Sequence, residues 1–149
     1  MLWFAISGGI LLVALVATAR LLPPVAGTRA LLLAPFVFLA IPTMSTLQKG
    51  NVQVIIVAMS ILAMILFERK RPIAGGALLA YAIACKLYPG LLVVYLMARR
   101  QWRAFAWTAA WGAAYCLATL LLFGLLPYHA FLEHFPRLLS GEAFPAFRN

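Results

Sequence analysis

The sequence predicts an all-α fold, a polytopic bundle of transmembrane helices. Apolar residues make up 66% of the 149 positions, whereas charged residues make up only 10%, and the mean hydropathy is +1.02. Soluble domains average about 45–50% apolar and about 25% charged residues, so this chain has too few polar side chains to cover a water-soluble core. The apolar residues also form long runs separated by basic residues, as membrane spans do. We therefore expect a multi-pass protein of the cell membrane whose residues 1–149 form a single transmembrane domain in contact with membrane lipids.

The apolar runs define the expected elements in order along the chain. Pro35 and Pro42 lie inside the second run, and because proline removes a backbone hydrogen bond, this helix should kink or end early. Trp102 and Trp107 lie near one end of the last run and Tyr128 near the other, which is typical of interfacial anchors. The expected spans are residues 2–19, 30–47, 52–67 and 104–126, with a hairpin over 73–98 and an extracytoplasmic tail over 127–149.

The stretch from 73 to 98 allows two models. As one helix it would be about 39 Å long, enough to span a bilayer with tilt. Its middle, however, combines Lys86, Pro89 and Gly90, which disfavour a continuous helix. A re-entrant or broken helical hairpin around Lys86 would place the basic clusters 69–71 and 99–103 together on the cytoplasmic side, as the positive-inside rule requires. We favour this hairpin, which puts the Lys86 turn, Lys49 and the tail on the extracytoplasmic face.

Charge and cysteine content exclude several classes of partner. The chain has twelve Lys and Arg against three acidic residues, all Glu, for a net charge of +9. These cations lie between apolar runs, where lipid headgroups act on them, so we expect no nucleic-acid partner. Cys85 and Cys116 lie inside apolar runs without metal-ligand spacing, so we expect no metal site, and we predict no cofactor.

Lys86 is the strongest candidate for a functional side chain. An ammonium group within the membrane costs about 2.5–3.5 kcal/mol on insertion scales and is usually retained for a function. At a break between two half-helices, Lys86 could contact a phosphate, while Tyr88 and Pro89 shape the turn. Pro89 suits the first turn of the second half-helix, because its missing N–H would be unpaired there. The alternative is that Lys86 only extends to the interface.

A second polar element, Gly50-Asn51-Val52-Gln53, opens the third span. Asn51 suits the N-cap of that helix, which alone could explain its presence. The amides of Asn51 and Gln53 beside Gly50 also suit recognition of hydroxyl or phosphate groups. Both interpretations stay open from the sequence.

The tail contains Glu133 and His134, which are candidates for acid–base chemistry. His129 and Glu133 are four residues apart but miss the metalloprotease spacing. The alternative is an amphipathic interfacial segment in which Glu133 pairs with Arg137, although Pro136 weakens that pairing.

The order of these motifs resembles the central part of glycosyltransferase family 87, a GT-C-type membrane family. The motifs are Gly50-Asn51-Val52-Gln53, Arg69-Lys70-Arg71, Ala74-Gly75-Gly76, Lys86-Leu87-Tyr88-Pro89 and Arg99-Arg100-Gln101-Trp102-Arg103. The tail from Ser140 to Asn149 is also similar to an extracytoplasmic stretch of that family. The resemblance covers about residues 47–149.

This resemblance implies a membrane hexosyltransferase, in the characterised members a mannosyltransferase, with a GT-C-like fold. The donor would be a polyprenyl-phosphate-linked sugar and the acceptor a glycan or glycolipid on the extracytoplasmic face. Substrate binding would fall to Lys86, Tyr88, Pro89, Gly50, Asn51 and Gln53.

The general base of GT-C enzymes is usually a loop Asp, and this chain has no Asp. Glu133 and His134 are the remaining candidates for that role. We therefore expect an internal fragment of a longer enzyme that is inactive alone.

The alternative function is a transporter or lipid-handling membrane protein that binds an anionic substrate. Broken helices at the bilayer midplane are also typical of transporters, and Lys86 could bind the anion. Transporters usually contain repeated halves, and the sequence shows no internal repeat.

Overall fold

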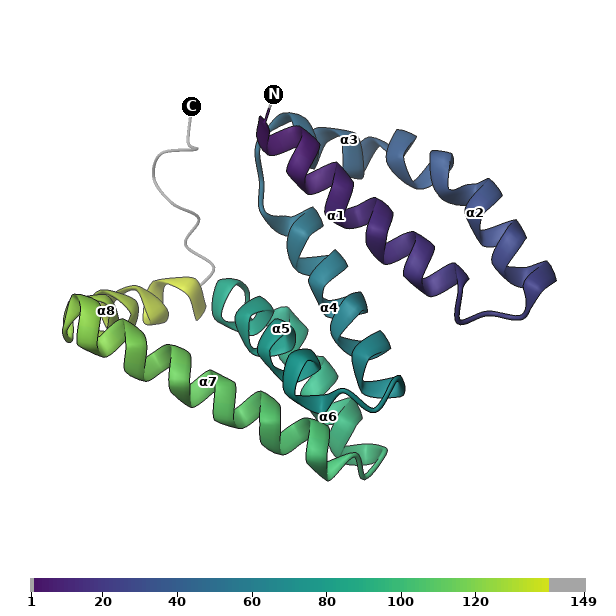
Figure 1. The fold of residues 1–149 in the computed structure, drawn as a ribbon. Coiled ribbons are helices and arrows are strands. Elements are labelled where there is room, and N and C mark those ends of the chain that lie inside the picture. Colours follow the sequence, from purple (N-terminus) through teal and green to yellow (C-terminus); the bar gives the residue numbers. More distant parts are fainter. Residues whose placement is uncertain (1, 140–149) are drawn as a thin grey trace. The chain divides into compact units, whose positions relative to one another are not determined.

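The computed structural model describes residues 2–139, without the side chains of Pro42, His134 and residues 137–139. Every regular element in this part of the chain is helical (Figure 1), which confirms the predicted all-α class. The chain divides into two compact units, Met1–Ala113 and Ala114–Asn149. The expected single transmembrane domain stays a prediction. The helices are α1 (Leu2–Ala19), α2 (Pro24–Leu39), α3 (Ile41–Gln48), α4 (Gln53–Glu68), α5 (Pro72–Cys85), the short 3₁₀ helix η1 (Tyr88–Gly90), α6 (Leu91–Ala98), α7 (Trp102–Phe123) and α8 (Leu126–Leu139).

The expected span 30–47 is two helices, α2 and α3, separated by Ala40. Ala40 is extended, with ψ 131°, and α3 carries a proline in its first turn. A proline there needs no backbone donor, so the chain restarts as a new helix, as the position of Pro42 led us to expect. Helix α2 also begins earlier than predicted, at Pro24, because the extended Pro23 (ψ 148°) places Pro24 in the first turn.

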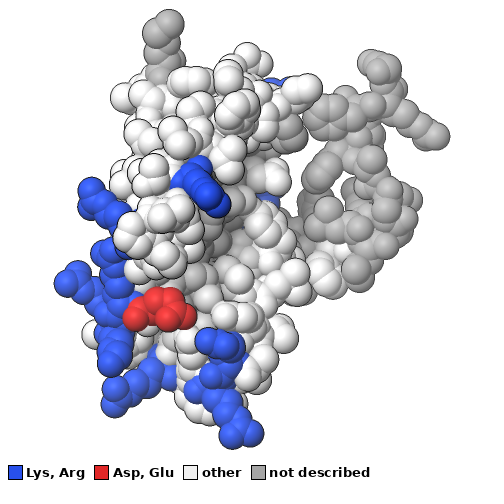
Figure 2. Space-filling model, turned by 90° about the vertical axis from the view of Figure 1, so that its right-hand side faces the viewer, with Lys and Arg blue, Asp and Glu red and all other residues white. Residues whose placement is uncertain are grey.

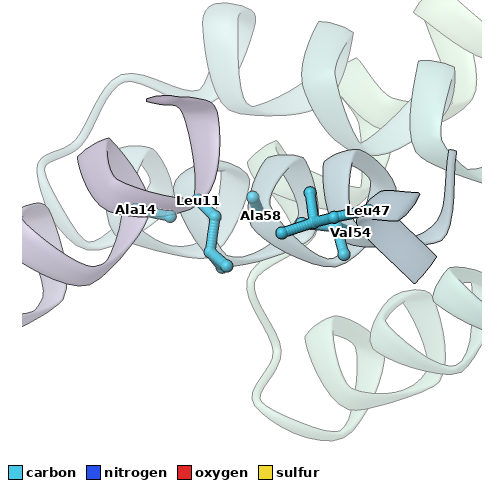
Figure 3. Packing of buried hydrophobic residues seen from close by; sticks show 5 residues of the cluster. All are labelled: Leu11, Ala14, Leu47, Val54 and Ala58. Atoms are coloured by element: carbon cyan, nitrogen blue, oxygen red, sulfur yellow. The ribbon is translucent and has the colours of Figure 1, made fainter. Parts of the chain in front are cut away.

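Helices α1 and α4 pack side by side and form the first apolar core. Its buried members are Leu11 and Ala14 of α1, Leu47 of α3, and Val54 and Ala58 of α4 (Figure 3). Ala14 and Ala58 are both 0% exposed. Small side chains let two helix backbones approach closely, which is the usual packing mode of helices in membranes.

A second core joins α4, α5, α6 and the start of α7. Phe67, Leu79, Leu96 and Ala104 are buried in it, one from each of these helices. Because the four helices share this core, the segment from α4 to the first turns of α7 packs as one bundle.

The segment 73–98 is broken into separate helices, as predicted, whereas its re-entrant placement in a membrane stays a prediction. Helix α5 ends at Cys85 and α6 begins at Leu91. Lys70 and Pro72, at the start of α5, line the same hollow as Arg100 and Trp102, which follow α6. The chain therefore reverses direction between α5 and α6, and both basic turns lie at one end of the first unit. Figure 2 shows basic side chains gathered at the lower end of the visible face.

The second unit contains the end of α7 and helix α8. Helix α7 stops at Gly124, which has φ +65°, a conformation that favours glycine. The hydroxyl of Tyr128 donates a hydrogen bond to the carbonyl of Cys116 at 2.6 Å. The expected tail 127–149 is therefore helical as far as Leu139, and residues 140–149 lie outside the described part of the chain.

Helices α1 and α7 are long and apolar enough to cross a membrane, by length and composition. Large apolar side chains on α7 are exposed, with Leu121 and Leu122 each 77% exposed. Shorter apolar helices make up most of the rest: α2, α4, α5 and the η1–α6 segment. This apolar outer surface suits contact with lipid.

Candidate functional site

The Lys86 turn connects α5 and α6. Lys86 ends α5 in an extended conformation (φ −149°, ψ 137°), and its N–H donates to the carbonyl of Ala82. The chain then enters η1, where the N–H of Gly90 donates to the carbonyl of Leu87 at 2.9 Å. Pro89 lies in the first turn of this 3₁₀ helix, which leads directly into α6, as predicted. The Lys86 side chain is exposed beside the turn.

Tyr88 and Pro89 line an apolar hollow of about 610 Å³ formed by α1, α4, η1 and α6. Its α4 wall runs from Val57 to Glu68, which is about 16 Å of helix at 1.5 Å per residue. The one hydroxyl on this α4 wall, that of the buried Ser60, donates to the carbonyl of Ile56 at 2.8 Å. The hydroxyl is therefore satisfied within its own helix, and the wall is suited to an apolar ligand. Lys86 does not line the hollow, but it is two residues from Tyr88.

The Gly50–Gln53 element leads into α4, and Val52, not the predicted Asn51, occupies the N-cap position. The carboxamide oxygen of Asn51 accepts the N–H of Gln53, the first residue of α4, at 3.0 Å. Gly50 has φ +66°, so it ends α3 in the left-handed region. This hydrogen bond gives Asn51 a structural role at the start of α4, and Asn51 and Gln53 are both exposed residues. Among the described residues, no hydrogen bond joins this element to the Lys86 turn.

Glu133 and His134 lie on α8 in the second unit. Glu133 is exposed, and the side chains of His134 and Arg137 are outside the described part of the structure. Pro136 lies inside α8 without ending it. The acid–base role considered for Glu133 or His134 and the Glu133–Arg137 pairing both stay predictions.

The comparison with known proteins identifies the family. The family model described as glycosyltransferase family 87 matches residues 1–148. The chain belongs to glycosyltransferase family 87.

A curated relative agrees with this membership. The polyprenol-phosphate-mannose-dependent alpha-(1-2)-phosphatidylinositol mannoside mannosyltransferase of Mycobacterium tuberculosis is 35% identical over 113 residues, which are 72% of this chain and 25% of the relative. The family 87 chain thus spans about a quarter of that relative's length. No solved structure matches the chain significantly.

Membership of family 87 confirms the resemblance seen in the motifs. The substrate-binding roles of Lys86, Tyr88, Pro89, Gly50, Asn51 and Gln53 stay predictions. In the structure Tyr88 and Pro89 line the same hollow, and Lys86 is close to them in the chain. Gly50, Asn51 and Gln53 do not line this hollow.

The sequence interpretation gave the cations at 69–71 and 99–103 only a topological role. The structure brings Lys70, Arg100 and Arg103 together around one hollow. This convergence depends on the reversal between α5 and α6. The hairpin model placed the two basic clusters on the same side, but the sequence did not predict that they would line a shared hollow.

Proposed function

We propose that the chain is the donor-binding part of a membrane glycosyltransferase that uses a polyprenyl-phosphate sugar and an extracytoplasmic glycan or glycolipid acceptor. The family and the polyprenol-phosphate-mannose dependence of the mycobacterial relative support a lipid-linked donor, with mannose as the first candidate sugar. The observation that carries the proposal is the position of the Lys86 turn beside the apolar hollow of Tyr88 and Pro89. A cation next to an apolar groove matches a ligand with a phosphate head and an isoprenoid tail.

The proposed reaction is an inverting displacement at the anomeric carbon. A carboxylate removes the proton from an acceptor hydroxyl, whose oxygen attacks that carbon. The bond from the anomeric carbon to the phosphate oxygen breaks, and its electron pair stays on the departing lipid phosphate. The ammonium of Lys86 would stabilise the charge that develops there. The chain lacks Asp, so Glu133 remains the sequence candidate for this carboxylate.

The proposed sidedness follows from helix length and charge. Helix α5 has 14 residues, about 21 Å at 1.5 Å per residue, whereas the hydrocarbon core is about 30 Å thick. A hairpin entering from the cytoplasmic side would therefore carry Lys86 about two-thirds of the way across. Cations at the cytoplasmic end agree with the positive-inside rule. This re-entrant geometry within a multi-pass protein leaves the Lys86 ammonium within reach of the outer leaflet.

Photocrosslinking with a diazirine-bearing polyprenyl phosphate tests this proposal. The chain would be reconstituted in phosphatidylcholine nanodiscs as wild type, Lys86→Met, Lys86→Arg and the control Arg29→Met, an exposed cation outside both basic turns. Hydrogen bonds to charged groups contribute about 1.5–3 kcal/mol, so Lys86→Met should weaken donor binding about 10- to 100-fold.

Lys86→Arg and Arg29→Met should retain binding within about threefold, because both keep a cation at position 86. Mapping of the crosslink should place it at the Lys86 turn and not at Arg99–Arg103. Equal binding by wild type and Lys86→Met, or a crosslink confined to Arg99–Arg103, would contradict the proposal.

A further inference from the structure

We propose that the two basic turns, 69–71 and 99–103, form a binding site for the phosphate headgroup of an anionic phospholipid. This basic-turn site lies at the end of α5 opposite the Lys86 turn, so it is separate from the proposed donor site. It does not depend on the proposed function.

The first observation is that the two turns have the same backbone motif. Just after the end of α4, Lys70 has φ +57°, and the N–H of Arg71 donates to the carbonyl of Leu66 at 2.9 Å. Just after the end of α6, Arg100 has φ +54°, and the N–H of Gln101 donates to the carbonyl of Leu96 at 2.9 Å. Both are Schellman-type helix ends, in which the left-handed position is usually glycine.

A third helix end in the same chain has glycine at the left-handed position, as is usual for this motif. Just after the end of α3, Gly50 has φ +66°, and the N–H of Asn51 donates to the carbonyl of Thr46 at 3.0 Å. Side chains disfavour the left-handed region, so Lys70 and Arg100 carry a conformational cost that Gly50 avoids. Residues held in such conformations cluster at ligand-binding sites. The positive-inside rule explains cations in these turns, but it does not require them at the strained positions.

The second observation is that the turns converge on two adjacent hollows. One, of about 440 Å³, is lined by Lys70, Arg100 and Arg103. The other, of about 610 Å³, is lined by Lys70, Arg71 and Arg103. Lys70 and Arg103 therefore border both hollows, and four cations surround this region. Arginine forks bind phosphate oxygens in a bidentate manner.

The third observation is that these cations lack acidic partners. The described residues contain two carboxylate side chains, Glu68 and Glu133, and neither lines the basic hollows. Within that part of the chain, no ion pair joins an acidic side chain to Lys70, Arg71, Arg100 or Arg103. Among the described residues, Glu68 precedes the first turn without pairing with these cations. The four cations around the two hollows repel one another, and a bound anion would relieve that repulsion.

The fourth observation favours a lipid over a free phosphate. Besides the cations, the larger hollow is lined by Trp107 and Trp111 of α7 and by Ile73 and Ala77 of α5. Tryptophan and aliphatic side chains of this kind lie at the level where headgroups meet acyl chains. A basic mouth above an apolar wall fits an amphipathic ligand, and basic pockets between membrane helices bind anionic lipid headgroups.

Native mass spectrometry of the chain released from nanodiscs tests the proposal. The nanodiscs would contain phosphatidylcholine with or without phosphatidylglycerol, and the variants would be Arg100→Gln/Arg103→Gln and the charge-matched control Arg20→Gln/Arg29→Gln. Each cation near the membrane surface contributes about 1 kcal/mol toward an anionic lipid. Loss of two should reduce phosphatidylglycerol binding about 30-fold, whereas the control should bind like wild type.

A second variant separates binding from folding. Lys70→Gly removes a cation and supplies the residue that the left-handed conformation favours. It should therefore melt no lower than wild type in phosphatidylcholine and still lose phosphatidylglycerol binding about fivefold. Unchanged lipid binding by Lys70→Gly would overturn the proposal.

The remaining outcomes also decide the proposal. If Arg100→Gln/Arg103→Gln and Arg20→Gln/Arg29→Gln reduce phosphatidylglycerol binding equally, the effect is one of general charge and the proposal is overturned. If the wild-type chain retains no phosphatidylglycerol, the site does not exist and the proposal is likewise overturned. Displacement of the lipid by millimolar inorganic phosphate would identify a free-phosphate site and overturn the lipid assignment.

Discussion

Gly75 and Gly76 set how closely α5 approaches its neighbours. A Cβ atom on Gly75 would lie 2.6 Å from the Phe67 ring of α4, and one on Gly76 would lie 2.7 Å from the backbone carbon of Trp107 in α7. A ring can rotate away, but a helix backbone cannot without moving the helix. Gly76 is therefore the position at which α5 and the first part of α7 depend on the absence of a side chain.

Gly76→Ala should destabilise the chain by about 1–3 kcal/mol, because overpacking at a helix backbone forces the helices apart. The matched control is Gly112→Ala on α7, where an added Cβ meets nothing within 4 Å. That substitution should be neutral or stabilising by up to about 1 kcal/mol through helix propensity. Thermal unfolding in detergent, followed by circular dichroism, measures both variants. Equal melting temperatures for the two would show that the close α5–α7 approach is wrong.

At the scale of elements, composition and prolines predicted most helix positions but not their connections. The bounds of α1 agree with the expected span 2–19, because an uninterrupted apolar run ends at a basic residue. The start of α2 was missed, since Pro23 and Pro24 suggest a loop until the first-turn preference of proline is applied. Helix α8 falls within the expected tail, where the sequence analysis offered an amphipathic segment as an alternative, and Pro136 lies inside the helix without ending it.

The hollow beside Tyr88 could not be predicted from the sequence. It is formed by α1, α4, η1 and α6, which are distant in the chain, and their packing depends on contacts such as Ala14 and Ala58 in the first core. Local signals did identify Tyr88 and Pro89 as parts of a turn, because a proline and a glycine interrupt an apolar run there. The basic hollows were also not predicted, because their lining residues come from helices that are brought together only by packing.

The hydrogen bond between Tyr128 and Cys116 should stabilise the turn from α7 to α8. Tyr128→Phe should lower local stability by about 0.5–1.5 kcal/mol, the usual contribution of one hydrogen bond. Hydrogen exchange should then be several-fold faster in residues 126–139 and unchanged in α1. Tyr95→Phe is the control, because its hydroxyl has no hydrogen-bond partner among the described residues. Exchange in α8 that is the same in both variants would exclude this role for Tyr128.

At the scale of the whole molecule, the basic turns and Lys86 lie at opposite ends of α5 within the first unit. The basic turns lie at the start of α5 and after α6, whereas Lys86 lies where α5 ends. The reversal between α5 and α6 produces this separation, because a continuous helix would carry the two basic clusters to opposite ends. Donor binding at the Lys86 turn and anionic lipid binding at the basic turns both require it.

Site-directed cysteine labelling tests the reversal directly. Cys85 and Cys116 are free and exposed, so both would first be replaced by alanine. Single cysteines would then replace Arg69, Arg99 and Lys49, and a membrane-impermeant maleimide would be added to intact cells and to sealed inside-out vesicles. We predict that positions 69 and 99 react only in inside-out vesicles and position 49 only in intact cells. Reaction of positions 69 and 99 from opposite sides of the membrane would contradict the fold-back at Lys86.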